Sequence, residues 1–265
     1  MYQDLTRLIA EIIPIVRRAA EFIRAEALSF NPEKLRFKTF NNFASYVDQT
    51  SEEILVEGLS VILPGAGFVT EENTAGMSDS SLNWIIDPLD GTTNFLHGYP
   101  ATAVTLALKE DQEILLGVTY LLHEDAVYHA VKGNGAWCGD KKLHVSDTTE
   151  LEKTLIISGF PYSLAGKDED YFRLIRQLLS HCHGIRSSGA SAVDLVHVAA
   201  GRADAYFEFN LYLWDIAAGI LLVEEAGGTV SDFNGGNRHL EAYEILAAGK
   251  VYPSLLGEVK ALWNR

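Results

Sequence analysis

Two aspartates and a run of small residues stand directly after a short apolar segment. The segment 84–86 is followed by Asp87 and Asp90, and then by Gly91 and Thr92. Carboxylates bind hard cations through oxygen, and free backbone N–H groups at the start of a helix bind phosphate. The pattern therefore favours metal-assisted chemistry on a phosphate. Taken alone it also fits a plain turn, because Asp-Pro and Asp-Gly pairs are common turn sequences.

Further acidic residues could contribute to the same chemistry. Glu71 and Glu72 follow the predicted strand 67–70, and ligands of α/β sheets tend to lie at the carboxyl ends of strands. Asp215 precedes an apolar helical segment, 216–226. The simpler explanations are a solvated loop for the glutamates and a helix N-cap for Asp215. Capping and cation binding are compatible, since a carboxylate has two oxygens.

The elements that must position these residues alternate between strands and helices, which predicts a layered α/β sandwich. The hairpin-rich middle of the chain predicts an antiparallel sheet. The expected helices are 5–20, 48–63, 168–179, 192–200, 216–226 and 253–263. The expected strands are 67–70, 84–86, 101–109, 114–122, 126–131, 136–138, 154–158, 184–186, 203–209, 229–231 and 245–247.

Composition and charge exclude several classes of protein. The 265 residues are 48% hydrophobic, enough for a large core, and carry a formal net charge of −15, which argues against nucleic acid as a direct partner. No segment approaches the roughly 18 uninterrupted apolar residues of a membrane span, and the amino-terminal segment does not read as a signal peptide. Cys138 and Cys182 are far apart, so we expect reduced thiols in a cytoplasmic protein.

The length allows one large domain or two packed subdomains. We expect a single unit over residues 1–265, with an α+β part in about 1–150 and an α/β part in about 151–265.

Two motifs resemble those of the inositol monophosphatase family. The segment 87–95, Asp-Pro-Leu-Asp-Gly-Thr-Thr-Asn-Phe, resembles the family's first motif, and 214–228 resembles its second. Glu71 and Glu72 fall where the family has its metal-binding glutamates, and the resemblance covers nearly the whole chain. It implies an α/β (α+β) fold in the form of a five-layered αβαβα sandwich, usually a homodimer, with Mg²⁺-dependent phosphomonoesterase activity.

The resemblance also implies a role for single residues in metal binding. One Mg²⁺ would bind Glu71, Asp87 and the backbone carbonyl of Leu89. A second would bind Asp87, Asp90 and Asp215.

A third, weaker ion would be held by Glu71 and, through water, by Glu72 or Asp48. Mn²⁺ could replace Mg²⁺, and Li⁺ would inhibit by displacing a Mg²⁺. The catalytic residues would be Glu71, Thr92 and Asp48, with Glu71 and Thr92 orienting and deprotonating the attacking water.

The phosphate of the substrate would be held by the backbone N–H groups of Gly91 and Thr92, and Lys38 matches a family lysine near the metals. The positions that match the family's substrate-binding residues are Asp90, Gly91, Thr92, Gly189, Ala190, Ser191, Glu208 and Asp215.

The chain departs from the family pattern beside the leaving-group pocket. Tyr212 stands where many members have histidine, and Ala190 where animal members have threonine. Glu208 favours a polyol ring over an adenosine, because a carboxylate accepts hydrogen bonds from two vicinal hydroxyls. A nucleotidase should carry basic and stacking residues near 189–208, where we find only Arg186 and Arg202.

The function that the resemblance implies is hydrolysis of myo-inositol 1-phosphate, and of related polyol or sugar phosphates, without a covalent phosphoenzyme. The alternatives are a 3′(2′),5′-bisphosphate nucleotidase, a fructose-1,6-bisphosphatase or a histidinol-phosphate phosphatase of the same fold. A non-catalytic interaction protein is disfavoured, because the acidic residues of the motifs are intact. The expected partner is a small phosphomonoester, with no nucleic acid and no membrane.

Overall fold

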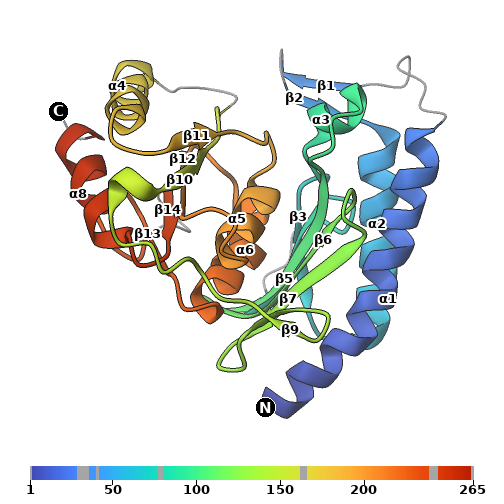
Figure 1. Cartoon of the computed structure of the whole chain (residues 1–265). Helices are drawn as coiled ribbons and strands as arrows, with labels where there is room; N and C mark the ends of the chain where they lie inside the picture. Colours follow the sequence, from blue (N-terminus) through green and yellow to red (C-terminus); the bar gives the residue numbers. More distant parts are fainter. Residues whose placement is uncertain are drawn as a thin grey trace.

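Two β-sheets and three layers of helices alternate through the molecule (Figure 1). The structure is a computed structural model that describes residues 2–28, 36–39, 42–76, 80–161, 166–238 and 244–263. The order of the layers is helix, sheet, helix, sheet, helix. This arrangement confirms the αβαβα sandwich predicted from the sequence.

Seven strands form the first sheet, in the order β3-β4-β5-β6-β7-β8-β9. β3 pairs with β4 in parallel, and the other neighbours are antiparallel. Helices α1 (Tyr2–Ala27) and α2 (Tyr46–Ile62) cover the outer face of this sheet (Figure 1). The strands are β3 (Gly67–Thr70), β4 (Leu82–Asp90), β5 (Ala103–Glu110), β6 (Glu113–Leu121), β7 (Ala126–Val131), β8 (Ala136–Cys138) and β9 (Lys141–Lys142).

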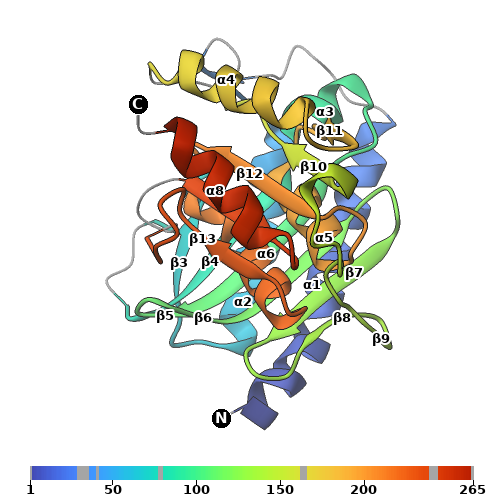
Figure 2. The same cartoon turned by 60° about the vertical axis from the view of Figure 1, so that its left-hand side comes forward.

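Five strands form the second sheet, in the order β11-β10-β12-β14-β13. β10 is parallel to both of its neighbours, whereas β14 is antiparallel to both of its own. Helices α4 (Asp168–Leu179) and α8 (Tyr252–Trp263) lie on the outside, as Figure 2 shows. The strands are β10 (Leu155–Ser158), β11 (Gly184–Arg186), β12 (Ala205–Phe209), β13 (Thr229–Ser231) and β14 (Glu244–Ala248).

Four short elements complete the described chain. Helix α3 (Thr92–His97) follows β4, and the 3₁₀ helix η2 (Leu151–Lys153) precedes β10. β1 (Arg36–Thr39) and β2 (Asn42–Ala44) pair antiparallel near α3. Among the described helices none is both long and apolar enough to cross a bilayer.

The middle helix layer explains the most hydrophobic helical segment of the sequence. It consists of α5 (Ser191–Ala199) and α6 (Leu213–Glu225), which lie between the two sheets. All residues of the run 216–223 are buried, because protein covers this layer on both sides. The outer helix α4 instead buries a single stripe of Tyr171, Leu174 and Leu178, as expected of a helix with one face on a sheet.

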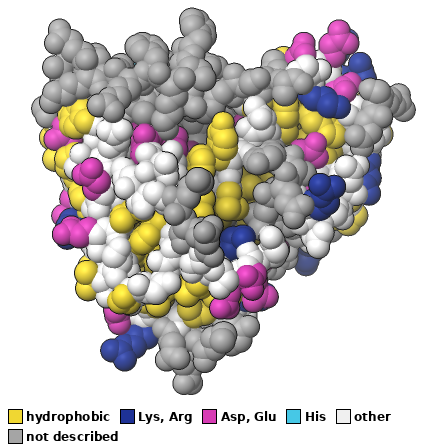
Figure 3. Space-filling view, turned by 180° about the vertical axis from the view of Figure 1, so that it is seen from behind, with side chains coloured by type: hydrophobic (Ala, Val, Ile, Leu, Met, Phe, Trp, Pro, Cys, Tyr) yellow, Lys and Arg dark blue, Asp and Glu magenta, His cyan; other side chains and the backbone are white. Residues whose placement is uncertain are grey.

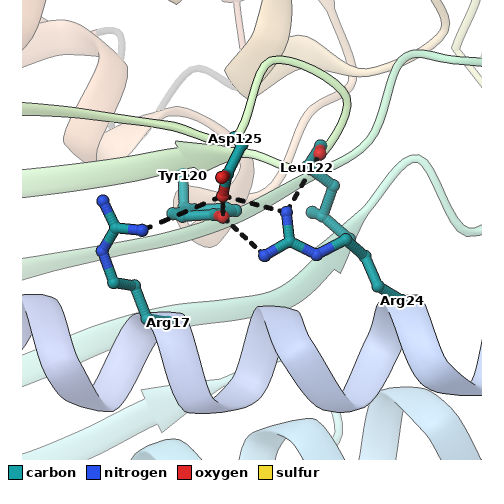
Figure 4. Close-up of polar contacts among 5 residues, drawn as sticks. All are labelled: Arg17, Arg24, Tyr120, Leu122 and Asp125. Atoms are coloured by element: carbon teal, nitrogen blue, oxygen red, sulfur yellow. Dashed lines mark hydrogen bonds and ion pairs between the residues drawn. The ribbon is translucent and has the colours of Figure 1, made fainter.

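Polar contacts tie α1 to the turn between β6 and β7 (Figure 4). Arg24 donates hydrogen bonds to Asp125 Oδ1 at 3.0 Å and to the Tyr120 hydroxyl at 2.8 Å. Arg17 adds a longer contact to Asp125, at 3.8 Å. On the other side of the same turn, Arg202 after α5 donates to Glu124 Oε2 at 3.1 Å. The turn is therefore attached to the helices on both faces of the first sheet.

Close packing between the first sheet and the middle layer requires a glycine on β6. A Cβ added to Gly117 would lie 2.8 Å from the Cα and 2.9 Å from the carbonyl oxygen of Ala218 in α6. We therefore expect Gly117→Ala to lower the free energy of unfolding by about 1–3 kcal/mol, because sheet and helix backbones must separate. Urea denaturation measures this change.

The matched control is Gly65→Ala, where an added Cβ meets nothing within 4 Å. We expect that variant to stay within about 0.5 kcal/mol of the parent protein. Equal stability of the two variants would show that the sheet and α6 are not as closely packed as described.

Candidate active site

Acidic side chains from distant parts of the chain line one pocket of about 330 Å³. Glu71 follows β3, Asp87 and Asp90 lie near the end of β4, and Asp215 is in the first turn of α6. Glu208 on β12 lines the same pocket. The structure thus brings together the five carboxylates that the sequence singled out on four separate segments.

An irregularity in β4 lets Asp87 and Asp90 share the pocket. Residues three apart on a regular strand point to opposite faces of the sheet. Here Asp87 pairs with Thr105 and Asp90 with Ala103, so β4 has one residue more than β5 across this interval. Pro88 lies within the bulge and cannot donate to a neighbouring strand. The predicted strand ended at residue 86, whereas β4 continues to Asp90 with this bulge.

Burial and mutual repulsion raise the pKa values of the pocket carboxyls. Burial is the largest cause for Asp87, followed by the charges of Glu71, Asp90 and Asp215. Burial likewise raises the pKa of Asp90 to about 7, although the backbone N–H of Ala192 lowers it by donating to Asp90 Oδ2 at 2.8 Å. The pKa of Asp215 is also raised, first by burial. Ionising the carboxyl groups of Asp87, Asp90 and Asp215 together therefore costs free energy unless a cation compensates their charge.

Asp215 occupies a different helix position from the one expected. It is the third residue of α6 rather than its N-cap, because the helix begins at Leu213. Asp215 is therefore not the N-cap itself, but it still caps the helix: its Oδ2 accepts the backbone N–H of the N-cap residue Tyr212, at 2.7 Å. A carboxylate near a helix N-terminus is stabilised by the helix dipole, and this contact fixes the side chain at the edge of the pocket.

The donor chemistry of the pocket fits a hard divalent cation. No Lys or Arg is among its described lining residues, and carboxylate oxygens are the ligands that Mg²⁺ prefers. No three acidic, His or Cys side chains of the described residues already enclose a common ion position. The carboxylates nevertheless share one pocket and raise one another's pKa values. Mg²⁺ usually keeps several of its waters, so one or two carboxylates can suffice to bind it. Lys38 lies on β1, and its side chain is outside the described part of the chain.

Gly91 and Thr92 form the neutral side of the pocket. Gly91 has a φ of 84°, and an added Cβ would lie 2.7 Å from the carbonyl oxygen of Ala101. Thr92 begins α3, and its hydroxyl lies 2.9 Å from Asp48 Oδ1 and 3.1 Å from the carbonyl oxygen of Leu89. Asp48 is 1% exposed and is not part of the pocket lining. It therefore reaches the site through Thr92.

The pocket lining also contains the residues predicted to bind the leaving group. Gly189, Ala190 and Ser191 line it at the start of α5. Asn94 on α3 donates to the carbonyl oxygen of Ser188 at 2.9 Å. This bond joins α3 to the segment before α5, so the two sides of the pocket are held together.

Glu208 is held in a closely fitted position in the same pocket. The Tyr206 hydroxyl donates to Glu208 Oε2 at 2.6 Å, and a Cβ added to Gly159 would lie 1.8 Å from the same oxygen. Burial, the largest cause, raises the pKa of Glu208 to about 7. Gly159 was missed from the sequence because only the fold brings it against Glu208.

Aromatic side chains from outside the segment 189–208 also line the pocket. Phe160 and Tyr212 are 60% and 48% exposed. The Tyr212 ring stacks on Trp214, with centroids 4.9 Å apart and planes 12° from parallel. Arg186 and Arg202, the basic residues noted in the sequence, are not among the lining residues. The pocket lining therefore includes two exposed aromatic rings, and no Lys or Arg is among its described residues.

The comparison with known families decides the classification of the chain. The model of the inositol monophosphatase family matches residues 4–263. The chain belongs to the inositol monophosphatase family. The resemblance that rested on the two motifs is therefore confirmed over nearly the whole length.

Relatives within the inositol monophosphatase family carry two kinds of name. "Putative Nus factor SuhB" of Neisseria meningitidis serogroup B is 41% identical over 247 residues, which cover 92% of this chain and 95% of the relative. "Inositol-1-monophosphatase" of Mesorhizobium japonicum is 41% identical over 221 residues, 83% of each chain. The crystal structure of extragenic suppressor protein suhB from Bartonella henselae has a TM-score of 0.91 at 35% identity, over 96% of this chain and 98% of that one.

The raised pKa of Glu208 predicts a measurable dependence of stability on pH. The folded protein holds a proton on this carboxyl up to about pH 7, whereas an unfolded glutamate loses it near pH 4.3. The stabilising contribution is therefore complete below about pH 4.3 and is lost as the pH rises through about 7. Glu208→Gln keeps a neutral side chain at every pH.

We expect the wild type to lose about 1–2 kcal/mol more stability than Glu208→Gln when the pH is raised from about 5.5 to 7.5. Urea denaturation in the presence of a chelator measures both proteins. An identical pH dependence in the two would mean that Glu208 is not protonated in the folded protein.

Proposed function

We propose that this chain is a Mg²⁺-dependent phosphomonoesterase that hydrolyses myo-inositol 1-phosphate and related polyol or sugar phosphates. The observation that carries the proposal is the convergence of Glu71, Asp87, Asp90 and Asp215 on a pocket that also contains Thr92. Relatives named inositol-1-monophosphatase support the same reaction class. Water would attack the phosphorus directly, with no covalent intermediate on the protein.

The acidic side chains would hold two to three Mg²⁺ ions in the sets expected from the family. Bound Mg²⁺ would supply charge neutralisation on the phosphate and a lower pKa for a coordinated water. The four carboxylates have the oxygen ligands for this role, and the pKa values of three of them are raised in the ion-free protein. Cation binding would release those protons and relieve the repulsion.

The chain's own residues would then orient the reactants. The backbone N–H groups of Gly91 and Thr92 would hold the phosphate. The Thr92 hydroxyl, fixed by Asp48 and the Leu89 carbonyl, would orient the attacking water, and Glu71 would accept its proton. Asp48 would act by positioning Thr92.

The far side of the pocket supports a cyclic polyol as the leaving alcohol. Glu208 Oε2 accepts from Tyr206, and its other oxygen can accept a substrate hydroxyl. Tyr212 presents a ring whose orientation is fixed by stacking on Trp214, and such a ring can pack against the C–H face of a sugar or inositol. A pocket lined by both the Glu208 carboxyl group and the Tyr212 ring suits a hydroxyl-rich ring better than an open chain.

A second candidate function rests on the relatives that are named Nus factor SuhB. In this role the chain would act by binding a partner, whether or not it also hydrolyses a phosphomonoester. On the face shown in Figure 3, the described Lys and Arg side chains are interspersed with acidic ones. The absence of a nucleic-acid partner, the homodimer and the cytoplasmic location stay predictions.

The first test of the proposed function is a panel of phosphomonoesters with Mg²⁺, for the wild type and Asp87→Asn. We expect the wild type to release phosphate fastest from inositol 1-phosphate. The variant should lose roughly 100-fold or more in kcat, because Asp87 is assigned to both principal ions. Phosphate release at saturating Mg²⁺ is the measurement.

The control for this test is Asp140→Asn, which changes an exposed aspartate in the turn between β8 and β9. Near-wild-type turnover of Asp87→Asn would refute the metal assignment. Faster cleavage of an adenosine bisphosphate would move the substrate to a nucleotide. If no compound were hydrolysed, the factor role would become the better explanation.

The stacked Tyr212 ring in the pocket lining predicts that Tyr212→Ala changes the substrate preference. We expect kcat/KM for inositol 1-phosphate to fall roughly 3- to 10-fold, from the loss of a stacking contact of about 1 kcal/mol. The value for the acyclic glycerol 2-phosphate should change little. Tyr212→Phe keeps the ring and should behave like the wild type. Equal losses for both substrates in Tyr212→Ala would argue against a ring-binding role.

A further inference from the structure

Glu52 on α2 is a buried carboxylate beside the candidate active site that the proposed mechanism does not use. Its side chain is 0% exposed, and it is not part of the pocket lining. A buried carboxylate is costly unless hydrogen bonds compensate for the lost water. The partners of Glu52 therefore indicate what this residue does.

Within the described part of the chain, the hydrogen-bond partners of Glu52 come from one short segment, 70–74, which carries Glu71. Oε1 accepts from the Thr70 hydroxyl at 2.7 Å, and from the backbone N–H and the hydroxyl of Thr74, each at 2.8 Å. Oε2 accepts the backbone N–H of Glu72, also at 2.8 Å. Four donors nearly fill the acceptor capacity of a carboxylate. Glu52 thus serves the segment rather than an external ligand.

These contacts fix the backbone on both sides of Glu71. Thr70 and Glu72, its chain neighbours, are both bound to Glu52. The backbone N–H of Glu71 itself donates to the carbonyl oxygen of Ile86 on β4, at 3.2 Å. Glu71 is therefore attached to α2 and to the strand that carries Asp87. Four hydrogen bonds to one buried carboxyl group therefore hold this segment against α2.

Helix α2 also carries Asp48, the residue that positions Thr92. Asp48 lies one turn before Glu52 on α2, and the two positions, four residues apart, face the same side of a helix. Both side chains are buried, and Asp48 Oδ1 lies 2.9 Å from the Thr92 hydroxyl. One turn of α2 thus contacts the segment of Glu71 and the start of α3.

We propose that Glu52 is a positioning residue that sets the Glu71–Glu72 backbone for cation binding before any cation arrives. The proposal rests on the proposed function, in which Glu71 binds Mg²⁺. Through Asp48 and Glu52, α2 then fixes the positions of Thr92 and Glu71, the two residues that act on the attacking water. A preset ligand loses less conformational freedom when it binds.

The test compares Glu52→Gln with Glu53→Gln, which changes the exposed neighbour on the same helix. A glutamine directs an N–H₂ group at donors that need an acceptor. In the metal-free protein, we expect the amide protons of Glu72 and Thr74 to exchange roughly 10-fold faster in Glu52→Gln. Glu53→Gln should match the wild type.

Calorimetric titration with Mg²⁺ is the second measurement. We expect Glu52→Gln to weaken Mg²⁺ binding roughly 10- to 100-fold, as is typical for residues that orient metal ligands. The kcat at saturating Mg²⁺ should fall much less than the Mg²⁺ affinity, a split that general destabilisation would not produce. Thr74→Val removes only one donor from an exposed residue and should show the same two effects at a few-fold size.

Unchanged amide exchange and unchanged Mg²⁺ affinity in Glu52→Gln would overturn the proposal. If that variant does not fold, Thr74→Val decides in the same way. The exchange measurement needs no metal, so it tests Glu52 separately from the proposed function. A wild type that binds no Mg²⁺, together with fast exchange in Glu52→Gln, would refute the metal role of Glu71 and leave Glu52 as the anchor of its segment.

Discussion

Repulsion among carboxylates in one buried pocket is the constraint on which the rest of this structure depends. Asp87, Asp90 and Asp215 each have a raised pKa, first because they are buried, and the charge of Glu71 raises all three further. Left to themselves such groups would separate or stay protonated. The surrounding fold holds these carboxyl groups near one another, which lowers the stability of the folded protein. A divalent cation bound among them would relieve this unfavourable interaction, and the relief would add to its binding free energy.

Backbone N–H groups provide much of this restraint. One oxygen of each aspartate accepts such a donor: Leu89 for Asp87, Ala192 for Asp90, and Tyr212 for Asp215. The donors for Asp90 and Asp215 lie at or beside the starts of α5 and α6, where N–H groups lack partners within the helix. The middle helix layer therefore fills the core between the sheets and also orients the acidic pocket. Buried Asp48 and Glu52 on α2 restrain the other side.

Much of the site was predictable from local sequence, and the failures have clear physical causes. The acidic pairs, the small residues after Asp90 and the helical segments were recognised because their chemistry and periodicity are local. The expected N-cap position of Asp215 was off by three residues, because α6 begins at Leu213 and Asp215 accepts the N–H of the true N-cap, Tyr212. Tyr212 was noted only as a departure from the family, because its stacking on Trp214 appears in three dimensions alone.

The sequence by itself determined the kind of chemistry available, since carboxylates, backbone amides and hydroxyls keep their properties wherever they lie. It also determined the family and the layered fold, through two motifs and a regular alternation of strands and helices. Only the tertiary structure decided which of these groups meet. The bulge in β4 turns Asp87 and Asp90 to one side, and Gly159 leaves room for Glu208. Such directions arise from pairing and packing between segments far apart in the chain, which no local pattern encodes.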